Sequence, residues 1–375
     1  MRFLPLILKN IARSHRRSLL MTAGIAVAVF VVTALLTVEA GFGALIGSAE
    51  DTLLNVREKG LACPLTSRVH DSYLWTIARL PSVRAATGVL RGLYTYQVKE
   101  NLVVVSGVDY DAFRGLKDVR LLEGSEQAFA ARPDAALVGR PLAVQHRWKV
   151  GQTVTLLEDR LTFTVAGIFA APDKSYETGM LLHKEYLARV KRDEGKSTFF
   201  VVRLADPAAL PAVSRAIDGE FANAPKPTKT QSERAARERE LQDFREIRRM
   251  MGLMVVAAIV VSIFGAANSV SMSVRERTRE VGILRSLGLR REHILQILVG
   301  ESVFVSLAGG AIGASLAALL MATDRTLGGM IPLAFRPSAL AVAAAVSVVI
   351  GLVGAVLPAA RAARLPIVTA LKLAD

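Results

Sequence analysis

Four long runs of apolar residues divide the chain. Residues 18–38, 250–274, 302–323 and 337–360 contain no Asp, Glu, Lys or Arg over 21, 25, 22 and 24 positions. A bilayer core about 30 Å thick needs about 20 helical residues that rise ~1.5 Å each, so each run is long enough to cross it. One such run is compatible with a buried core helix, but four in 375 residues predict an integral membrane protein.

The segment between the first two runs follows a different pattern. Residues 40 to about 225 contain charged side chains, turns and no long apolar run. Short stretches rich in β-branched and aromatic residues predict strands at 93–98, 102–108, 136–138, 153–157, 161–169 and 198–204. Helical spacing predicts helices near 46–54, 73–80, 181–190 and 208–221. The expected fold class is a membrane protein with four transmembrane α-helices and a large α+β domain between the first and second helices.

Residues 226–249 join this domain to the second apolar run. They contain eight basic and five acidic side chains, and no Gly or Pro occurs between residues 228 and 251. We predict a solvated helical stalk, continuous with the second transmembrane helix, that carries movement of this helix to the external domain. A flexible charged linker is the alternative.

The excess positive charge lies beside the apolar runs. The formal net charge is +14, and residues 1–18, 275–293 and 361–375 together hold +10 of it. Short segments rich in Lys and Arg stay on the cytosolic side, whereas long loops translocate regardless of charge. We therefore expect a multi-pass protein of the inner (plasma) membrane with both termini in the cytosol. Because topology accounts for these bases, we expect no nucleic-acid partner.

The N-terminal 17 residues have an amphipathic pattern. Leu4, Ile7, Leu8 and Ile11 recur at helical spacing, with basic residues at other positions. This pattern predicts a helix along the inner membrane surface, with membrane lipids as its partner. A cleaved signal peptide is the alternative, but its apolar region is typically ~7–15 residues long, and the 21-residue run favours a retained anchor.

These features predict a series of segments. They are a cytosolic amphipathic helix (1–17), transmembrane helix 1 (18–39), an external domain (40–225), a stalk helix (226–249), transmembrane helix 2 (250–274), a cytosolic helix (275–293), transmembrane helix 3 (294–323), an external loop (324–336), transmembrane helix 4 (337–360) and a cytosolic tail (361–375).

The sequence offers no pattern typical of an enzyme or a metal site. The five histidines form no HExxH spacing, and there is no nucleophile elbow. A single cysteine, Cys63, excludes an intrachain disulfide, and we expect it to be a buried thiol. Residues 195–198 (GKST) resemble the end of a phosphate-binding loop, but Val190 stands where the first Gly is required. We expect no catalytic residue, no metal and no cofactor.

The charged segment after the second run has a helical pattern. Arg275, Glu276, Arg279 and Glu280 stand at i+3 and i+4 spacings, and Gly288 stands where a helix would end. On the other side, apolar residues recur every three positions, at Val281, Leu284 and Leu287. Such a helix can place its apolar ridge in a groove on a partner and its charges at the rim. A solvated hairpin that only connects two transmembrane helices is equally compatible.

Several stretches resemble one family. The run SVRERTREVGILRSLGLRREHILQILVGES (273–302) resembles the segment between the second and third transmembrane helices of MacB/FtsX-like ABC transporter permeases. LPAARAARLPIVTALK (357–372) resembles their C-terminal segment, with Pro366-Ile367 in place of the usual acidic-Pro pair. Five pieces resemble their periplasmic core domain: VVSGVDYDAF (104–113), LLEG (121–124), ALVGRPLA (136–143), VGQTVTL (150–156) and FTVAGIF (163–169). The resemblance covers nearly the whole chain in the same order.

The resemblance implies a mechanism called mechanotransmission. ATP binds to a separate ABC ATP-binding subunit, so this chain is not expected to be an enzyme. ATP-driven dimerisation of two such subunits moves the transmembrane helices, and stalk helices pass the movement to the periplasmic domains. A second permease copy is implied, as a homodimer or a pair of paralogues, and a periplasmic adaptor is a further candidate partner. The implied coupling helix contains Arg275, Glu276, Arg277, Arg279, Glu280, Gly282, Ile283, Leu284, Arg285 and Gly288.

Glu301 is an acidic residue predicted to lie inside the membrane. It follows Ile294 by seven positions, which places it ~10 Å into the third transmembrane helix. Such a residue is a functional candidate by default. The resemblance favours a structural pairing of Glu301 with basic residues at the inner leaflet over a proton relay.

The sequence leaves three functions open. The first is a permease of an exporter or extraction machine, the second an activator of a periplasmic enzyme as in FtsX-type proteins, and the third a passive membrane scaffold. Lipoproteins, peptides, small amphiphiles and glycolipids are all compatible substrates. The sequence does not distinguish a homodimer from a heterodimer.

Overall fold

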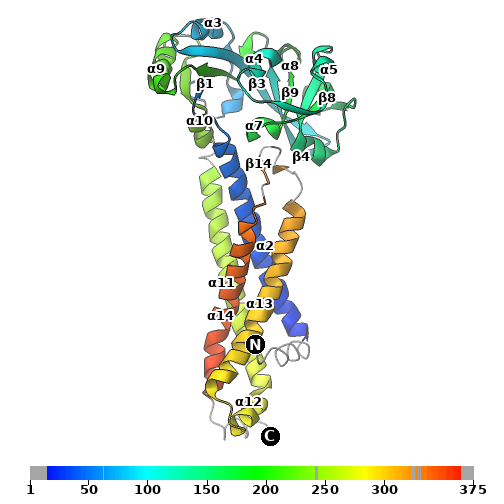
Figure 1. Cartoon of the computed structure of the whole chain (residues 1–375), viewed down its shortest axis with the longest axis vertical. Helices are drawn as coiled ribbons and strands as arrows, with labels where there is room; N and C mark the ends of the chain where they lie inside the picture. The colour runs from blue at the N-terminus through cyan, green and yellow to red at the C-terminus, as the bar shows by residue number, and fades with distance from the viewer. Residues whose placement is uncertain are drawn as a thin grey trace. The chain divides into compact units, whose positions relative to one another are not determined.

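The chain divides into two structural units. The computed structural model describes residues 15–61, 63–240, 244–321, 326–327, 329, 331–333 and 335–364. Unit 1 comprises residues 1–37, 246–322 and 335–375, and unit 2 comprises residues 38–245 and 323–334. Figure 1 labels many of the helices and strands.

Unit 1 is a bundle of long helices. Four helices of the described residues are long and apolar enough to cross a membrane, and a shorter helix lies between the second and third of them. The helices are α2 (His15–Gly47, whose last residues belong to unit 2), α11 (Phe244–Glu276), α12 (Thr278–Ser286), α13 (Arg291–Met321) and α14 (Ser338–Ala363). The predicted fold class, with four candidate membrane helices and a domain of mixed helices and strands between the first and second, is confirmed.

Small residues form the contacts between the bundle helices. A side chain on Gly313 of α13 would overlap the carbonyl oxygen of Ala26 on α2. A side chain on Gly354 of α14 would lie 2.6 Å from the Cβ atom of Ala266 on α11. Small residues let helix backbones approach closely where lipid provides no hydrophobic driving force. The bundle is therefore held by close backbone packing.

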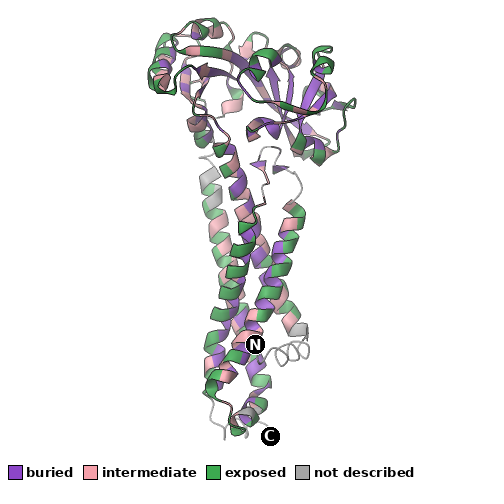
Figure 2. Ribbon diagram, viewed as in Figure 1, coloured by how far each residue is buried: buried purple, intermediate pink, exposed green. Residues whose placement is uncertain are grey.

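The large apolar side chains of the bundle face outward. Leu253, Phe264 and Leu319 are 64%, 70% and 75% exposed, and Figure 2 shows exposed residues along the outer faces of the long helices. Contiguous apolar surface of this extent is rare on soluble monomers. These faces fit a hydrocarbon environment.

Unit 2 is built on one mixed sheet of ten strands among its described residues. Its order is β12-β1-β11-β3-β4-β9-β6-β8-β5, with β7 paired to β8. The β4–β9 and β6–β8 pairs are parallel and the other pairs are antiparallel. The strands are β1 (Leu53–Glu58), β3 (Val83–Tyr96), β4 (Val98–Val108), β5 (Arg120–Gly124), β6 (Ala135–Gly139), β7 (Thr153–Thr155), β8 (Thr162–Ala170), β9 (Met180–His183), β11 (Phe199–Leu204) and β12 (Thr228–Ser232).

Short helices cover the sheet, and two small strand pairs complete unit 2. The helices are α3 (Tyr73–Ala78), α4 (Tyr110–Arg114), α5 (Glu126–Ala130), α6 (Arg140–His146), α7 (Lys174–Glu177), α8 (Lys184–Lys191), α9 (Leu210–Glu220) and α10 (Glu233–Glu240). The 3-10 turns are Pro64–Thr66, Glu158–Arg160 and Pro207–Ala209. The small pairs are β2 (Val69–His70) with β10 (Lys196–Ser197) and β13 (Thr326–Leu327) with β14 (Ile331–Pro332).

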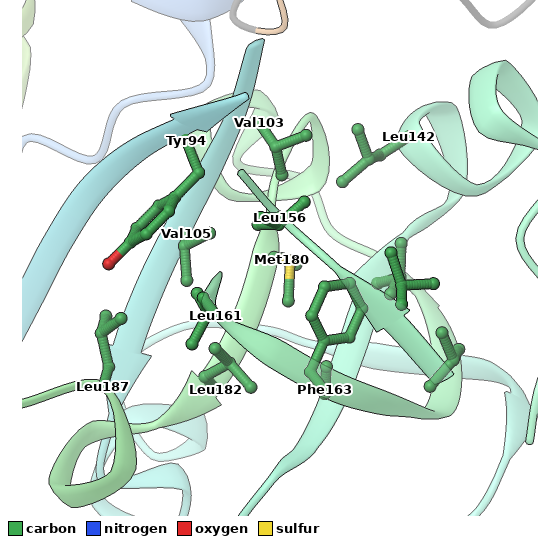
Figure 3. Close-up of a cluster of buried hydrophobic side chains, with 14 of the residues drawn as sticks. Tyr94, Val103, Val105, Leu142, Leu156, Leu161, Phe163, Met180, Leu182 and Leu187 are labelled. Carbon is green, nitrogen blue, oxygen red and sulfur yellow. The ribbon is translucent and has the colours of Figure 1, made fainter. Parts of the chain in front are cut away.

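Large apolar side chains fill the core of unit 2. Figure 3 shows one cluster, in which Tyr94 of β3, Val105 of β4, Phe163 of β8 and Met180 of β9 meet Leu187 of α8. A second cluster lies around Phe113, Phe129 and Phe169, and a third around Ile77, Phe200 and Ile217. All these side chains are almost fully buried, as in a water-soluble domain.

Three segments of unit 2 differ from the sequence prediction. Leu53 and Leu54, expected in a helix, lie in β1, where both are fully buried because both faces of the sheet are covered. Residues 181–183, expected at the start of a helix, lie in strand β9, which is largely buried. The start of the predicted stalk, residues 228–232, is β12, which pairs with β1 at the sheet edge. A short apolar run does not distinguish strand from helix by its period alone.

Some predicted segments lie outside the described residues. These are residues 1–14 of the predicted amphipathic helix and residues 365–375 of the predicted tail. Residues 241–243, between α10 and α11, also lie outside them, so the predicted continuity of the stalk with the second membrane helix stays a prediction.

Candidate coupling helix and buried charge cluster

The helix α12 begins and ends at well-defined backbone positions. Arg277 has φ −110° and ψ 14°, which are not helical values, and it separates α11 from α12. The Thr278 hydroxyl donates a hydrogen bond to the Val274 carbonyl at 2.9 Å. After α12, Gly288 has φ +91°, a left-handed conformation that favours glycine. Gly288 therefore stands at the helix end that the sequence indicated.

One face of α12 packs into the bundle. Val281 is 7% exposed and belongs to a cluster with residues of α11, α13 and α14. The cluster contains Val270, Val274, Val281, Ile294, Leu298, Ala355, Ala359 and Ala362. Gly282 is also buried. This face fixes α12 to three of the long helices.

The opposite face of α12 is exposed and apolar at its centre. Ile283 is 44% exposed and Leu287 is 74% exposed, and Glu280 is exposed on the same side. These positions are spaced by three and four residues, so they lie on one helical face. The prediction that residues 281, 284 and 287 form one exposed apolar ridge is wrong for Val281, which is buried in the bundle. At about 100° per residue, Val281 and Leu287 lie about 120° apart.

The other predicted coupling residues have different environments. Arg275 and Glu276 are exposed and Arg285 is half-buried, whereas the side chains of Arg279 and Leu284 lie outside the described residues. These environments leave Glu280, Ile283 and Leu287 as the described face that a partner can contact.

Arg277 and Glu301 form an ion pair inside unit 1. The Arg277 Nη1 atom donates to the Glu301 Oε2 atom at 3.2 Å, and Arg277 is buried. Glu301 therefore pairs with a basic residue at the end of α11. Arg277 connects the start of α12 to α13 and does not belong to the exposed face.

Unit 2 contains a buried charge cluster, which we define as Lys117, Asp173, Glu233 and Arg237. The Lys117 Nζ atom lies 2.8 Å from Asp173 and 2.7 Å from Glu233. The Arg237 guanidinium donates to both Asp173 oxygens, at 3.0 and 3.1 Å, and to Glu233 at 3.3 Å. The four side chains are less than 10% exposed and their formal charges cancel.

Mutual attraction keeps these groups charged despite burial. Burial alone would raise the pKa of Asp173, but Lys117 and Arg237 lower it well below its ordinary value. Burial alone would lower the pKa of Lys117, but Asp173 and Glu233 raise it above its ordinary value. Removing one member of such a group strands the others in a medium that solvates them poorly.

The cluster joins α10 to the end of α2. The Arg237 Nη1 atom donates to the Leu45 carbonyl at 2.7 Å and to the Ser48 hydroxyl at 3.1 Å. Carbonyls in the last turn of a helix lack helical partners and carry partial negative charge, so a cation stabilises them. The prediction of a solvated stalk is wrong for α10, because one face of this helix is buried. Glu233 and Arg237 have the i, i+4 spacing of an ordinary solvated pair, so no pattern in the sequence indicated that they are buried.

Two other sequence expectations concern unit 2. Cys63, expected to be buried, is exposed. Lys196 and Ser197 form strand β10 and not a phosphate-binding loop. Among the described residues, no group of three or more His, Cys, Asp or Glu side chains is placed to hold a metal ion.

Comparisons with known proteins identify two family regions. Residues 18–220 match the family described as MacB-like periplasmic core domain, and residues 252–367 match the FtsX-like permease C-terminal family. The chain is 39% identical over 127 residues to the macrolide export ATP-binding/permease protein MacB of Escherichia coli strain K12, covering 34% of this chain and 20% of that protein. It is 38% identical over 122 residues to the pyoverdine export ATP-binding/permease protein PvdT of Pseudomonas putida, covering 32% and 18%. The chain thus spans about a fifth of the length of these relatives.

Solved structures of external domains are also similar. The periplasmic region of MacB from Actinobacillus actinomycetemcomitans aligns with a TM-score of 0.39 at 9% identity, covering 52% of this chain and 96% of that one. The extracellular domain of the transporter YknZ from Gram-positive bacteria aligns with a TM-score of 0.37 at 10% identity, covering 48% and 99%.

Proposed function

Because this chain belongs to the MacB/FtsX-like ABC transporter permeases, a family of multi-pass inner-membrane proteins, we propose that it transmits movement of a separate ATP-binding subunit to unit 2. The movement drives export or extraction of a substrate such as a lipoprotein, a peptide or another amphiphile. The proposal places the chain termini and α12 in the cytosol. It requires a second permease copy, identical or paralogous.

The observation that carries this proposal is the two-faced packing of α12. Val281 fixes one face in a cluster with α11, α13 and α14, while Ile283 and Leu287 are exposed on the other. A force on the exposed face therefore reaches three long helices through direct contacts. Lipid is a poor occupant for this face, because the exposed carboxylate of Glu280 on the same side is costly to place in hydrocarbon.

The buried charge cluster supports the second half of the proposal. Arg237 binds the last turn of α2 and Asp173 of the domain body, and it lies on α10, which precedes α11 in the chain. The same buried charge cluster therefore attaches both the end of α2 and α10 to the rest of unit 2. A displacement of either helix end has to move the body of unit 2 or break buried ion pairs, which is costly.

The test is binding of the separate ATP-binding subunit that the proposal requires. We expect the double variant Ile283→Asp, Leu287→Asp to lose more than tenfold in affinity, because buried apolar contacts at the centre of an interface typically contribute about 2 kcal/mol or more. Co-purification from membranes, with quantification of both chains, measures the effect. Both side chains are exposed, so the variant should insert and fold normally.

The matched control is Val144→Asp, an exposed apolar position on helix α6 of unit 2. This control should leave co-purification unchanged. Undiminished co-purification of the α12 double variant would contradict docking through this face.

A non-transporting activator of a periplasmic enzyme is the second candidate, because the same α12 face and the same charge cluster serve it equally well. The gene neighbourhood separates the two functions. A neighbouring cell-wall hydrolase favours activation, whereas a periplasmic adaptor favours export. The absence of any ATP-binding partner would favour a passive scaffold and contradict both.

A further inference from the structure

Unit 2 contains a cavity that the proposed function does not use. Its volume is about 260 Å³, slightly below the roughly 300–1,000 Å³ typical of small-molecule sites. One side is a face of the main sheet, with Val104 of β4 and Phe199 of β11. Ala236 of α10 and Leu45 at the end of α2 also line it, and the loop that contains Leu65 completes it. The walls are therefore largely apolar.

Arg91 of β3 is an unusual member of this lining. Its guanidinium carbon lies 4.7 Å from the centre of the Tyr176 ring and 5.1 Å from that of the Phe199 ring. Its Nε atom donates to the Ser106 hydroxyl at 3.2 Å, whereas its buried Nη2 atom has no hydrogen-bond partner. Among the described residues no carboxylate lies within ion-pair distance of Arg91. A buried N–H donor of a charged group is costly to leave unsatisfied, so this site favours an acceptor with negative charge.

The other charged groups of the lining strengthen this preference. Glu233 and Arg237 also line the cavity, but both are engaged in the buried charge cluster, whose charges cancel. The remaining charged side chains of the lining are two arginines, Arg57 and Arg91. Both carry positive charge at all physiological pH values. Arg91 thus places a positive charge beside apolar walls.

We propose that this cavity binds a small amphiphile with one anionic group, a carboxylate or a phosphate. The anionic group accepts hydrogen bonds from Arg91, including the Nη2 atom that lacks a protein partner. The apolar part lies against Leu45, Leu65, Val104 and Ala236. Because Leu45 and Ala236 belong to α2 and α10, bound ligand also stabilises the attachment of these two helix ends. This inference does not depend on export, and its test requires no ATP-binding subunit.

The single cysteine of the chain provides the measurement. Cys63 is exposed and lines the same cavity, so a bound ligand should shield its thiol from a maleimide reagent. We would place the full chain in nanodiscs of zwitterionic lipid and measure the labelling rate of Cys63 with increasing decanoate, decyl phosphate, decanol or inorganic phosphate. We expect decanoate or decyl phosphate to slow labelling at least fivefold at saturation. Which of the two binds more tightly identifies the headgroup chemistry.

Decanol and inorganic phosphate test the two halves of the proposal. Decanol lacks the charge and inorganic phosphate lacks the apolar chain, so each should bind at least tenfold more weakly than the matching amphiphile. Equal protection by decanol would overturn the role of Arg91. Equal protection by inorganic phosphate would overturn the role of the apolar walls.

Variants separate this site from general partition of amphiphiles into lipid. Arg91→Met should abolish protection by the anionic amphiphiles, and Arg91→Lys should retain part of it. The matched control, Arg79→Met, changes an exposed arginine outside the cavity and should behave like the wild type. Should Arg91→Met fail to fold, Leu65→Trp fills the cavity from its loop and should abolish protection with Arg91 intact. Protection unchanged in the folded Arg91→Met or Leu65→Trp variant would refute the site.

Discussion

The two compact units of this chain bury side chains of different sizes. Contacts in the helical bundle rely on small residues such as Gly313, Gly354 and Ala266, and many large apolar side chains face outward. Unit 2 does the reverse, because its centre is filled by Phe, Leu, Val and Tyr. The difference shows that the surrounding solvent decides which side chains are buried. Water drives large apolar groups inward, whereas lipid tails solvate them and leave backbone proximity to stabilise the helix contacts.

The two units also differ in the number of charged side chains that they bury together. In unit 1 the buried pair Arg277–Glu301 lies next to the end of α11, while in unit 2 four charges are buried together. The four-residue cluster is the least expected feature of a domain that is otherwise packed like a soluble protein. Substitutions in the two units should therefore lower stability for different physical reasons, and their effects can be measured separately. Both tryptophans of the chain, Trp75 and Trp148, lie in unit 2, so tryptophan fluorescence reports that unit alone.

The largest effect is expected for Asp173→Asn. It leaves Glu233 as the one carboxylate of the cluster beside Lys117 and Arg237, so one buried positive charge is uncompensated. Such a loss typically costs about 3–5 kcal/mol in the free energy of unfolding. Denaturant titration followed by tryptophan fluorescence measures this loss. Adding Lys117→Met removes one stranded charge and should recover part of the stability. The control Asp134→Asn disrupts an ion pair with a well-exposed Arg132 and should cost at most about 1 kcal/mol. Equal losses for residues 173 and 134 would show that burial of the cluster has no energetic consequence.

A smaller effect is expected for Gly313→Ala in the bundle. The added methyl group would overlap the backbone of α2, and overpacking typically costs about 1–3 kcal/mol. Helix loss on detergent titration, followed by circular dichroism, should shift to milder conditions, whereas the tryptophan signal of unit 2 should not. The matched control is Gly265→Ala on α11, where an added Cβ meets no atom within 4 Å. If the two alanine variants behave alike, close packing of α2 against α13 does not stabilise the bundle.

The smallest effect is a pH dependence of unit 2. The pKa of Asp173 lies well below its ordinary value because Lys117 and Arg237 outweigh the effect of burial. Its contribution is therefore complete above the pKa of about 3.9 for an unfolded Asp and is lost as the pH falls further. One proton changes the unfolding free energy by at most about 1.4 kcal/mol per pH unit. An unfolded Asp is already partly protonated at pH 4, so we expect the wild type to lose about 1 kcal/mol more between pH 4 and pH 3 than the double variant Asp173→Asn, Lys117→Met. If the unfolding free energies of the two proteins changed equally with pH, the lowered pKa of Asp173 would be contradicted.

The sequence by itself determined the membrane helices, the intervening domain and the position of α12. Runs of more than 20 uncharged residues have few alternatives in a folded chain, and Gly288 marks a helix end through its own backbone freedom. Glu301 was also identifiable, because an acid inside a predicted transmembrane helix requires a partner. These features depend on neighbouring residues along the chain or on the solvent around an element, so they can be predicted from the sequence alone.

Only the tertiary structure decided which residues face which neighbours. It buried Val281 and exposed Leu287, turned residues 228–232 into an edge strand, and brought Lys117 and Asp173 to Glu233 and Arg237. Lys117 and Glu233 are separated by 116 positions, and no local pattern encodes such a pairing. The cavity beside Arg91 likewise arises from five or more segments that meet only in the folded domain. Contacts between distant segments depend on how the elements pack, and a hydrophobic period describes only one element at a time.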